Sequence, residues 1–155
     1  MKNKKKPYYT QLREKVGKQK LLLPAVAVFI ENEKEEMLLV RKHGASMWVF
    51  PGGYVELDES IEQTARREVL EETGYKIKVG KIIGVYSGKG LTKIYSNGDI
   101  VQPLIIFVQA FIQSGGKRTD EEEIVEVKYF PVNKPPVLEK CCKKKYLMLK
   151  DFKAG

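Results

Sequence analysis

One stretch of helical periodicity within a strand-rich sequence most constrains the fold. Ile61, Ala65 and Val69 recur at four-residue spacing, which places them on one face of a helix. Gly74 follows the last of them and is suited to end the helix as its C-terminal cap. A helix with one apolar face has to bury that face against another layer of structure. We therefore expect a short amphipathic helix near the middle of the chain that packs on a sheet.

Segments rich in strand-forming residues precede and follow this helix. The first two, Leu21 to Ile30 and Met37 to Arg41, are separated by the charged turn Glu31 to Glu36 and are predicted to pair as a hairpin. After the helix we expect further strands and then a closing amphipathic helix, at Lys76 to Tyr86, Asp99 to Ile112, Glu123 to Phe130 and Leu138 to Phe152. Because strands outnumber helices, the expected fold class is α/β (α+β), with a mixed β-sheet flanked by helices.

The length and composition of the chain are those of one globular domain. Its 155 residues suffice for a sizeable core, and 43% of them are hydrophobic and 31% charged. We expect residues 1–20 to form a basic N-terminal lead-in with little chemistry, and residues 21–155 to form the single domain. The net charge is +8, but much of it lies in Lys2 to Lys6 and Lys140 to Lys145. That distribution favours solvated tails over a binding surface.

Neither a membrane partner nor export is expected from the sequence. The longest apolar runs, Leu21 to Ile30 and Val101 to Ile112, are too short to span a bilayer, and no apolar signal core follows the basic start of the chain. Cys141 and Cys142 are adjacent, which suits neither a disulfide framework nor a metal site. We expect these thiols to serve packing or to lie at the surface, in a cytoplasmic protein.

The central helix carries a cluster of carboxylates. At about 100° per helical residue, Glu68, Glu71 and Glu72 fall within an arc of roughly 100°, beside the apolar face. Their charges repel one another and oppose the helix dipole, and Arg67, four residues before Glu71, offers a single compensating charge. A hard divalent cation, Mg²⁺ or Mn²⁺, is the natural further partner. Taken alone, such a glutamate group is more often a solvated helix face.

Two glycines precede the helix and bear on the same site. Gly52 and Gly53 follow Trp48-Val-Phe-Pro51, where they are expected to break the chain direction. A backbone without side chains can approach a metal ion or a phosphate closely. Loop and helix are therefore expected to form one pocket.

In this segment the sequence resembles the Nudix hydrolase family, whose signature is G-x5-E-x7-R-E-U-x-E-E-x-G-U with U a bulky aliphatic residue. The chain supplies the fixed positions in register: Gly53, Glu59, Arg67, Glu68, Val69, Glu71, Glu72 and Gly74. Tyr75 is the one departure, and an aromatic ring can fill the apolar place of the last U. The resemblance extends over nearly the whole chain.

The resemblance implies an α/β/α sandwich and a metal-dependent hydrolase that cuts the diphosphate linkage of a nucleoside diphosphate joined to another group. It also implies roles for individual residues. The metal ligands would be Glu68, Glu71, Glu72 and a carbonyl of Gly52 or Gly53, and the orienting pair would be Arg67 with Glu59. In-line attack of water on phosphorus needs neutralised phosphate charge and a nearby carboxylate that accepts a proton.

The general base is left open, because family members place it on the helix or in a later loop. Asp120-Glu121-Glu122-Glu123 is the acidic loop in this chain, and Glu122 or Glu123 is the preferred distal ligand or base. An ordinary solvated acidic turn is an equal alternative.

Substrate contacts are predicted from isolated residues. Arg41, with its neighbour Lys42, ends a strand that faces the predicted pocket, and either side chain can hold phosphate oxygens. His43 is the only histidine, Trp48 can stack on a base or fill the core, and Tyr95 lies in a long loop where a substrate lid can sit. Ordinary surface, core or turn roles are the alternatives for each.

The sequence leaves the substrate open among nucleotides. A nucleoside triphosphate or its oxidised form leads, with a nucleotide sugar behind it. ADP-ribose is weakened, because family members that cleave it have a proline after the signature and Lys76 to Ile94 contains none. The alternatives are an RNA 5′-end pyrophosphohydrolase, to which the basic tails would contribute, and a non-catalytic nucleotide-binding module. A monomer or a homodimer fits equally.

Overall fold

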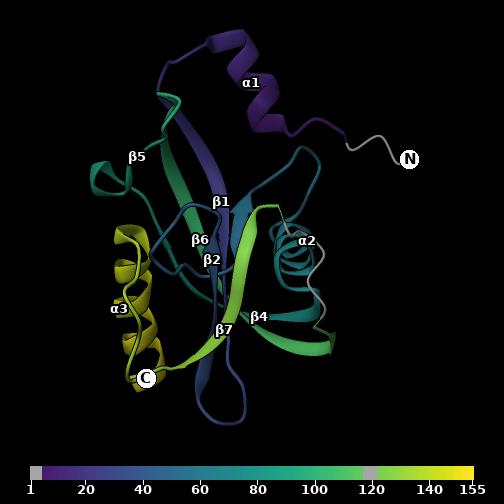
Figure 1. Cartoon of the computed structure of the whole chain (residues 1–155), viewed down its shortest axis with the longest axis vertical. Coiled ribbons are helices and arrows are strands. Elements are labelled where there is room, and N and C mark those ends of the chain that lie inside the picture. The colour runs from purple at the N-terminus through teal and green to yellow at the C-terminus, as the bar shows by residue number, and fades with distance from the viewer. Residues whose placement is uncertain (1–4, 117–121) are drawn as a thin grey trace.

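A mixed sheet forms the centre of the computed structural model, which describes residues 5–116 and 122–155 (Figure 1). Strand β1 (Leu21–Ile30) runs parallel to β6 (Ile100–Gly115) and antiparallel to β3 (Gly52–Tyr54). On its other edge, β6 pairs antiparallel with β4 (Tyr75–Tyr86) and β5 (Lys93–Ile94). The order β3-β1-β6-β4 confirms the predicted mixed sheet.

Strand β2 (Glu36–Lys42) lies outside this sheet and pairs antiparallel with β7 (Ile124–Pro131). The predicted hairpin of β1 and β2 is therefore wrong, and a bridge between Glu31 and Met37 is what joins their ends. The reason is that β3 and β6 already occupy both edges of β1. The turn between β1 and β2 is closed by the Asn32 side-chain oxygen, which accepts the backbone N–H groups of Lys34 and Glu36.

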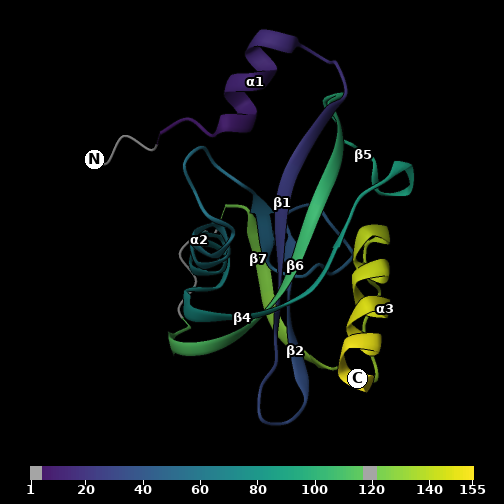
Figure 2. The ribbon, with the colours of Figure 1, turned by 180° about the vertical axis from the view of Figure 1, so that it is seen from behind.

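Helices α2 (Ile61–Thr73) and α3 (Lys140–Ala154) lie on opposite faces of the sheet (Figures 1 and 2). Strand β1 alternates between the two layers because successive side chains of a strand point to opposite faces. Val26 and Val28 pack in the core layer that contains Ala65 of α2, whereas Phe29 packs in the layer that contains Leu149 of α3. This arrangement confirms the predicted α/β/α sandwich.

The two ends of α2 are fixed by local hydrogen bonds, which helps to set the direction in which its glutamates point. Ser60 caps the first turn by accepting the N–H of Gln63, whose side chain accepts the Ser60 N–H in return. Gly74 ends the helix in the left-handed conformation, at φ 76°, as predicted. Ala65 and Val69 are fully buried between these caps. Both ends and the buried face are thus fixed, so the rotation of α2 about its axis is set.

Helix α1 (Tyr8–Val16) lies at one end of the sheet, on the opposite side of the molecule from the C-terminus (Figures 1 and 2). It contains no buried residue, so its position depends on contacts made by individual side chains. The loop between β4 and β5 contains a short 3₁₀ turn, η1 (Lys89–Leu91). None of the helices in the described ranges combines the length and apolar character needed to cross a membrane.

Candidate active site

A cavity of about 1130 Å³ lies beside the glutamates of α2. Its walls come from segments far apart in the sequence: α1, β1, β3, the C-terminal half of α2, the η1–β5 loop and the start of α3. Glu59, Arg67, Glu68 and Glu71 line one part of it, together with Gly52 and Gly53. The structure thus brings the predicted helix and glycine pair to one cavity.

Arg67 organises the carboxylates around it. Its guanidinium donates to both oxygens of Glu59, at 2.6 and 2.9 Å, and to the Tyr54 carbonyl at 3.1 Å. The same group lies 2.6 Å from Glu68 Oε1 and 3.5 Å from Glu71 Oε2. Hydrogen bonding to Arg67 lowers the pKa of Glu59 to about 2, so that this carboxylate is ionised. The bidentate pair fixes Arg67, and Arg67 in turn positions Glu68 and Glu71.

Glu72 lies deepest of the cluster, with 3% of its surface exposed. Its Oε2 accepts the Gly52 N–H at 3.0 Å, and its Oε1 lies 3.7 Å from the Lys42 ammonium. Burial raises the pKa of Glu72 to about 8, against the opposing attraction of Lys42. Burial also raises the pKa of Glu68. Carboxylates held out of water in this way gain most from a cation that neutralises them.

Gly52 and Gly53 form part of strand β3 instead of the predicted break, and a side chain at either position would meet a neighbouring group of β1 or α2. A Cβ on Gly53 would lie 2.4 Å from Glu68 Oε1, and one on Gly52 would lie 2.0 Å from the Val26 carbonyl oxygen. Gly52 also adopts φ 151°, which side chains disfavour. The glycines therefore let the backbone lie directly against the glutamate cluster.

Lys42 and Glu123 face this cluster from the smaller sheet. The Lys42 ammonium lies 2.7 Å from Glu123 Oε1, and both residues line the cavity. Burial lowers the pKa of Lys42, but the attraction of Glu72 and Glu123 outweighs it, and the net pKa is raised. Lys42 is therefore a permanent positive charge beside the carboxylates.

A family model described as the NUDIX domain matches residues 21–152, which is most of the chain and runs from the start of β1 into the last turn of α3. The chain belongs to the Nudix hydrolase family. Of the signature residues, Gly53, Glu59, Arg67, Glu68 and Glu71 line the cavity, and Glu72 is buried beside them. The family match confirms the resemblance.

Individual relatives carry different names. The chain is 35% identical over 121 residues to an ADP-ribose pyrophosphatase of Methanocaldococcus jannaschii, a match that covers 76% of this chain and 68% of that protein. It is 46% identical over 59 residues to a putative 8-oxo-dGTP diphosphatase of Bacillus subtilis (strain 168), which covers 38% of this chain and 40% of that protein. The Bacillus match thus spans less than half of the relative. The crystal structure of a UDP-X diphosphatase shares the fold, with a TM-score of 0.74 and 23% identity over 95% of this chain and 70% of that one.

Other predicted residues of this Nudix domain lie away from the cavity. Arg41 pairs with Glu126 at 3.0 Å and stacks over Trp48, whose ring packs edge-on against Phe130. His43 is exposed. Arg41, His43 and Trp48 are all absent from the cavity lining, so their predicted contact with substrate finds no support.

The acidic loop before β7 is described only in part. Both Glu122 and Glu123 are exposed, but only Glu123 of the two lines the cavity. Asp120 and Glu121 lie outside the described residues. The placement favours Glu123 over Glu122 as the distal ligand or base of the Nudix site.

Tyr95 lines the cavity as part of an aromatic wall that includes a residue of α1. Its hydroxyl lies 2.7 Å from that of Tyr54, and the Tyr9 ring stacks on Tyr54 at 5.4 Å between centroids. Tyr8 and Tyr9 both line the cavity, so the expectation that residues 1–20 carry little chemistry is not supported. Residues 1–20 lack the periodicity and signature residues that would have indicated this role.

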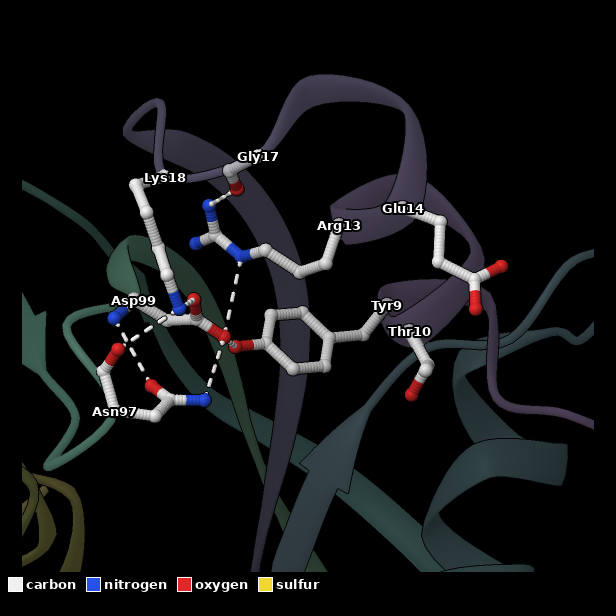
Figure 3. Close-up of a pocket in the computed structure, with 8 residues that line it drawn as sticks. All are labelled: Tyr9, Thr10, Arg13, Glu14, Gly17, Lys18, Asn97 and Asp99. Carbon is white, nitrogen blue, oxygen red and sulfur yellow. Dashed lines mark hydrogen bonds and ion pairs between the residues drawn. The ribbon is translucent and has the colours of Figure 1, made fainter.

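A buried aspartate holds α1 in that position. Figure 3 shows Tyr9, Arg13 and Lys18 pointing toward Asp99, around a smaller cavity of about 370 Å³. The Tyr9 hydroxyl lies 2.5 Å and the Lys18 ammonium 2.7 Å from the Asp99 carboxylate, and Arg13 Nε lies at 3.5 Å. The hydrogen bonds from Lys18 and Tyr9 lower the pKa of Asp99 to about 2. The contacts to Asp99 hold α1 in place, and none of the residues that make them belongs to the Nudix signature.

Glu68, Glu71 and Glu72, the Nudix cluster, have the oxygen donors that a hard divalent cation prefers. Their side chains are not already arranged around a single metal position. Within the described residues, no three acidic, histidine or cysteine side chains converge closely enough to hold a metal ion. Arg67 and Lys42 lie within 4 Å of the cluster's carboxylates instead. Three glutamates on one helix face and the adjacent glycine backbone provide hard oxygen donors, so the residues fit Mg²⁺ or Mn²⁺.

We predict that Gly53→Ala lowers kcat by about 100-fold, because the new methyl group displaces the Glu68 carboxylate and a small misplacement of a catalytic group is costly. Steady-state kinetics with a thermal melt would measure it. Gly90→Ala is the matched control, since a Cβ there meets no atom within 4 Å. Equal activity of the Gly53 and Gly90 variants would contradict the proposal that the close approach of the Gly53 backbone to Glu68 is needed for catalysis.

Proposed function

We propose that this Nudix protein is an Mg²⁺- or Mn²⁺-dependent pyrophosphohydrolase that cleaves the diphosphate linkage of a nucleoside diphosphate joined to another group. The observation that carries the proposal is the set of glutamates on α2, packed against the glycines of β3: Glu68 and Glu71 line a cavity that also presents a lysine, and Glu72 is buried beside them. In this arrangement, acidic groups that bind a cation lie beside a basic group that binds phosphate.

The proposed roles follow from exposure and contacts. Glu68, Glu71 and Glu72 would hold the cation, with a carbonyl of Gly52 or Gly53. When bound, the cation supplies positive charge to the phosphate oxygens and acidifies the attacking water. Glu71 has the most exposed side chain of the three, at 41%, and is best placed to accept that water's proton.

Groups across the cavity complete the proposed site. Lys42 would bind phosphate oxygens, while Glu123, its partner at 2.7 Å, is the second candidate for the base. Arg67, held by Glu59, would keep Glu68 and Glu71 oriented rather than contact the substrate. Each of these groups is fixed by a partner before substrate binds, which reduces the reorganisation that binding requires.

The dimensions and lining of the cavity bear on the substrate. Ligand pockets commonly enclose roughly 300 to 1,000 Å³, and this cavity of about 1130 Å³ leaves room for a nucleotide with a further group. Tyr9, Tyr54 and Tyr95 offer aromatic surface for a base. We propose a nucleoside triphosphate or a related nucleotide as substrate, with nucleotide sugars and ADP-ribose as the larger alternatives.

We predict that Lys42→Gln raises KM by about tenfold or more, because it removes a charge-assisted contact to phosphate, whereas Arg41→Gln changes KM little. The two residues are neighbours, but Lys42 lines the cavity and Arg41 pairs with Glu126. Initial-rate kinetics on both variants measure the difference. A larger effect at Arg41 would contradict the proposed phosphate contact.

The test of the function is a substrate panel with product identification. Nucleoside triphosphates, an oxidised triphosphate, nucleotide sugars, ADP-ribose, dinucleotides and triphosphorylated RNA would each be incubated with Mg²⁺ or Mn²⁺. We expect cleavage within a diphosphate of a small nucleotide. If the protein bound members of the panel but hydrolysed none of them, a non-catalytic module would replace the proposal. If it cleaved RNA alone, the proposed substrate class would be wrong.

A further inference from the structure

Lys145 is a buried charge that the proposed chemistry does not use. It lies on α3, has 7% of its surface exposed and lines the same cavity as the glutamates. Its described polar contact is Cys142 Sγ, at 3.7 Å, and no described carboxylate lies within ion-pair distance of it. The sequence placed it in a solvated lysine tail, which its burial contradicts. A buried ammonium with only a thiol as partner is costly unless an anion joins it.

Further polar groups without a complete set of partners line this part of the cavity. The Thr92 hydroxyl is buried and has no hydrogen-bond partner among the described residues. The next residue, Lys93, lies 4.0 Å from Glu139, the residue that caps the N-terminus of α3. The loop that carries Thr92 thus lies beside the start of α3, the helix that carries Lys145. Thr92 and Lys145 both line the cavity, and their hydroxyl and ammonium groups are hydrogen-bond donors that a ligand could use.

The charge balance of this region is positive. Lys93, Lys140 and Lys145 line the cavity here, and Glu139 is the one carboxylate among the described residues that lines it at the start of α3. Residues at the N-terminal end of α3 also line the cavity, and a helix N-terminus carries partial positive charge. The region is therefore opposite in sign to the glutamate cluster of α2.

We propose that Lys145, Thr92 and the first turn of α3 form a second, metal-independent subsite that binds an anionic group, either a phosphate or a carboxylate. The assignment of that anion to the substrate rests on the proposed function. In a nucleoside diphosphate joined to another group, the anion belongs to the part of the molecule farther from the cleaved linkage. The subsite thus selects substrates with an additional negative charge.

Cys141 provides a reporter for this subsite. It is partly buried, lines the cavity and lies one turn before Lys145. The hydrogen bond with Cys142 lowers the pKa of the Cys141 thiol, which favours alkylation by iodoacetamide. An anion bound at Lys145 would cover this thiol. Because Cys142 is fully buried, we expect iodoacetamide to modify Cys141. Peptide mapping identifies the modified residue.

The experiment measures the alkylation rate of Cys141 in the full chain, in excess chelator, with inorganic phosphate or acetate as the probe and chloride at equal ionic strength as the reference. We expect phosphate to slow alkylation saturably, by about tenfold at roughly ten times its dissociation constant. Acetate is the separate arm for carboxylates. Metal and turnover are both absent, so failure of the proposed hydrolysis leaves this result unchanged.

Lys145→Met should abolish the phosphate effect, because methionine keeps the aliphatic volume and removes the charge. Lys143→Met, on the exposed face of the same helix, should retain it. The comparison within each variant, with and without anion, removes any change in intrinsic thiol reactivity. Equal alkylation of the wild-type protein in phosphate, acetate and chloride would overturn the proposal, as would an anion effect that survives in Lys145→Met.

Discussion

Glu71→Gln is expected to lower kcat by about 1,000-fold or more, in line with the loss of a residue that acts in the transition state. The amide keeps the shape of the side chain, but it neither binds a hard cation strongly nor accepts a proton. Because 41% of the Glu71 side chain is exposed, the melting temperature should stay close to that of the wild-type protein. Kinetics and a thermal melt on the same sample measure both effects.

Glu72→Gln is expected to lower kcat by as much as Glu71→Gln does, but for a different structural reason. Glu72 is the most buried carboxylate of the cluster, and its ionised form is costly without a cation. The glutamine oxygen can still accept the Gly52 N–H, so stability should be equal or higher while turnover falls. Activity and stability that move in opposite directions identify a functional carboxylate.

The matched control for both variants is Glu62→Gln. Glu62 lies on the same helix, but its half-exposed side chain pairs with Arg66 at 2.5 Å on the solvent face. Removing this exposed ion pair should change stability by less than about 1 kcal/mol and leave kcat unchanged. Near wild-type turnover of the Glu71 and Glu72 variants would refute the metal-site assignment.

Removal of divalent metal is expected to abolish turnover, and Mg²⁺ or Mn²⁺ should restore it. Without the cation, Glu68 and Glu71 present only acidic oxygens to an anionic substrate, and Arg67 is already paired with Glu59. The remaining described cation among these contacts, Lys42, is paired with Glu123. Neutralisation of the diphosphate would therefore fail.

Activity before and after dialysis against chelator, followed by titration with each metal, measures this dependence. A thermal melt without metal serves as the control for folding, since the caps and core of α2 involve no metal ligand except Glu72. Turnover that persists in excess chelator would contradict the proposed mechanism.

The features that sequence predicted well are those set by local periodicity. The apolar face of α2, its glycine cap and its clustered glutamates depend on helical spacing alone, and the structure reproduces them. The mixed sheet was predicted because strand segments outnumber helical ones along the chain. Such patterns are local, so they survive without knowledge of the tertiary contacts.

The features that sequence missed depend on pairing between distant segments. The hairpin of β1 and β2 failed because β3 and β6 occupy both edges of β1, which no local pattern records. The sequence did not separate Arg41 from Lys42 as phosphate contacts, whereas the register of β2 against β7 pairs Arg41 with Glu126 and leaves Lys42 facing the glutamates. One residue of register exchanges the two faces of a strand.

The role of α1 and the burial of Lys145 were also beyond the sequence. Helix α1 is held at the cavity by contacts to Asp99, which the sequence of the helix alone does not predict. Lys145 belongs to a run of lysines that reads as a solvated face, and only the packing of α3 on the sheet shows that it is covered. In both cases a partner remote in sequence determines the environment.

The most direct test of the central claim is hydrolysis in ¹⁸O-labelled water. The protein, Mg²⁺ or Mn²⁺ and the substrate identified by the panel would be incubated, and the products analysed by mass spectrometry. Attack of water on phosphorus predicts one ¹⁸O atom in one phosphate-bearing product, with no product in excess chelator or from Glu71→Gln. Phosphate products without the label, or the same labelled product formed by chelated or Glu71→Gln protein, would contradict cleavage at a glutamate-held metal site.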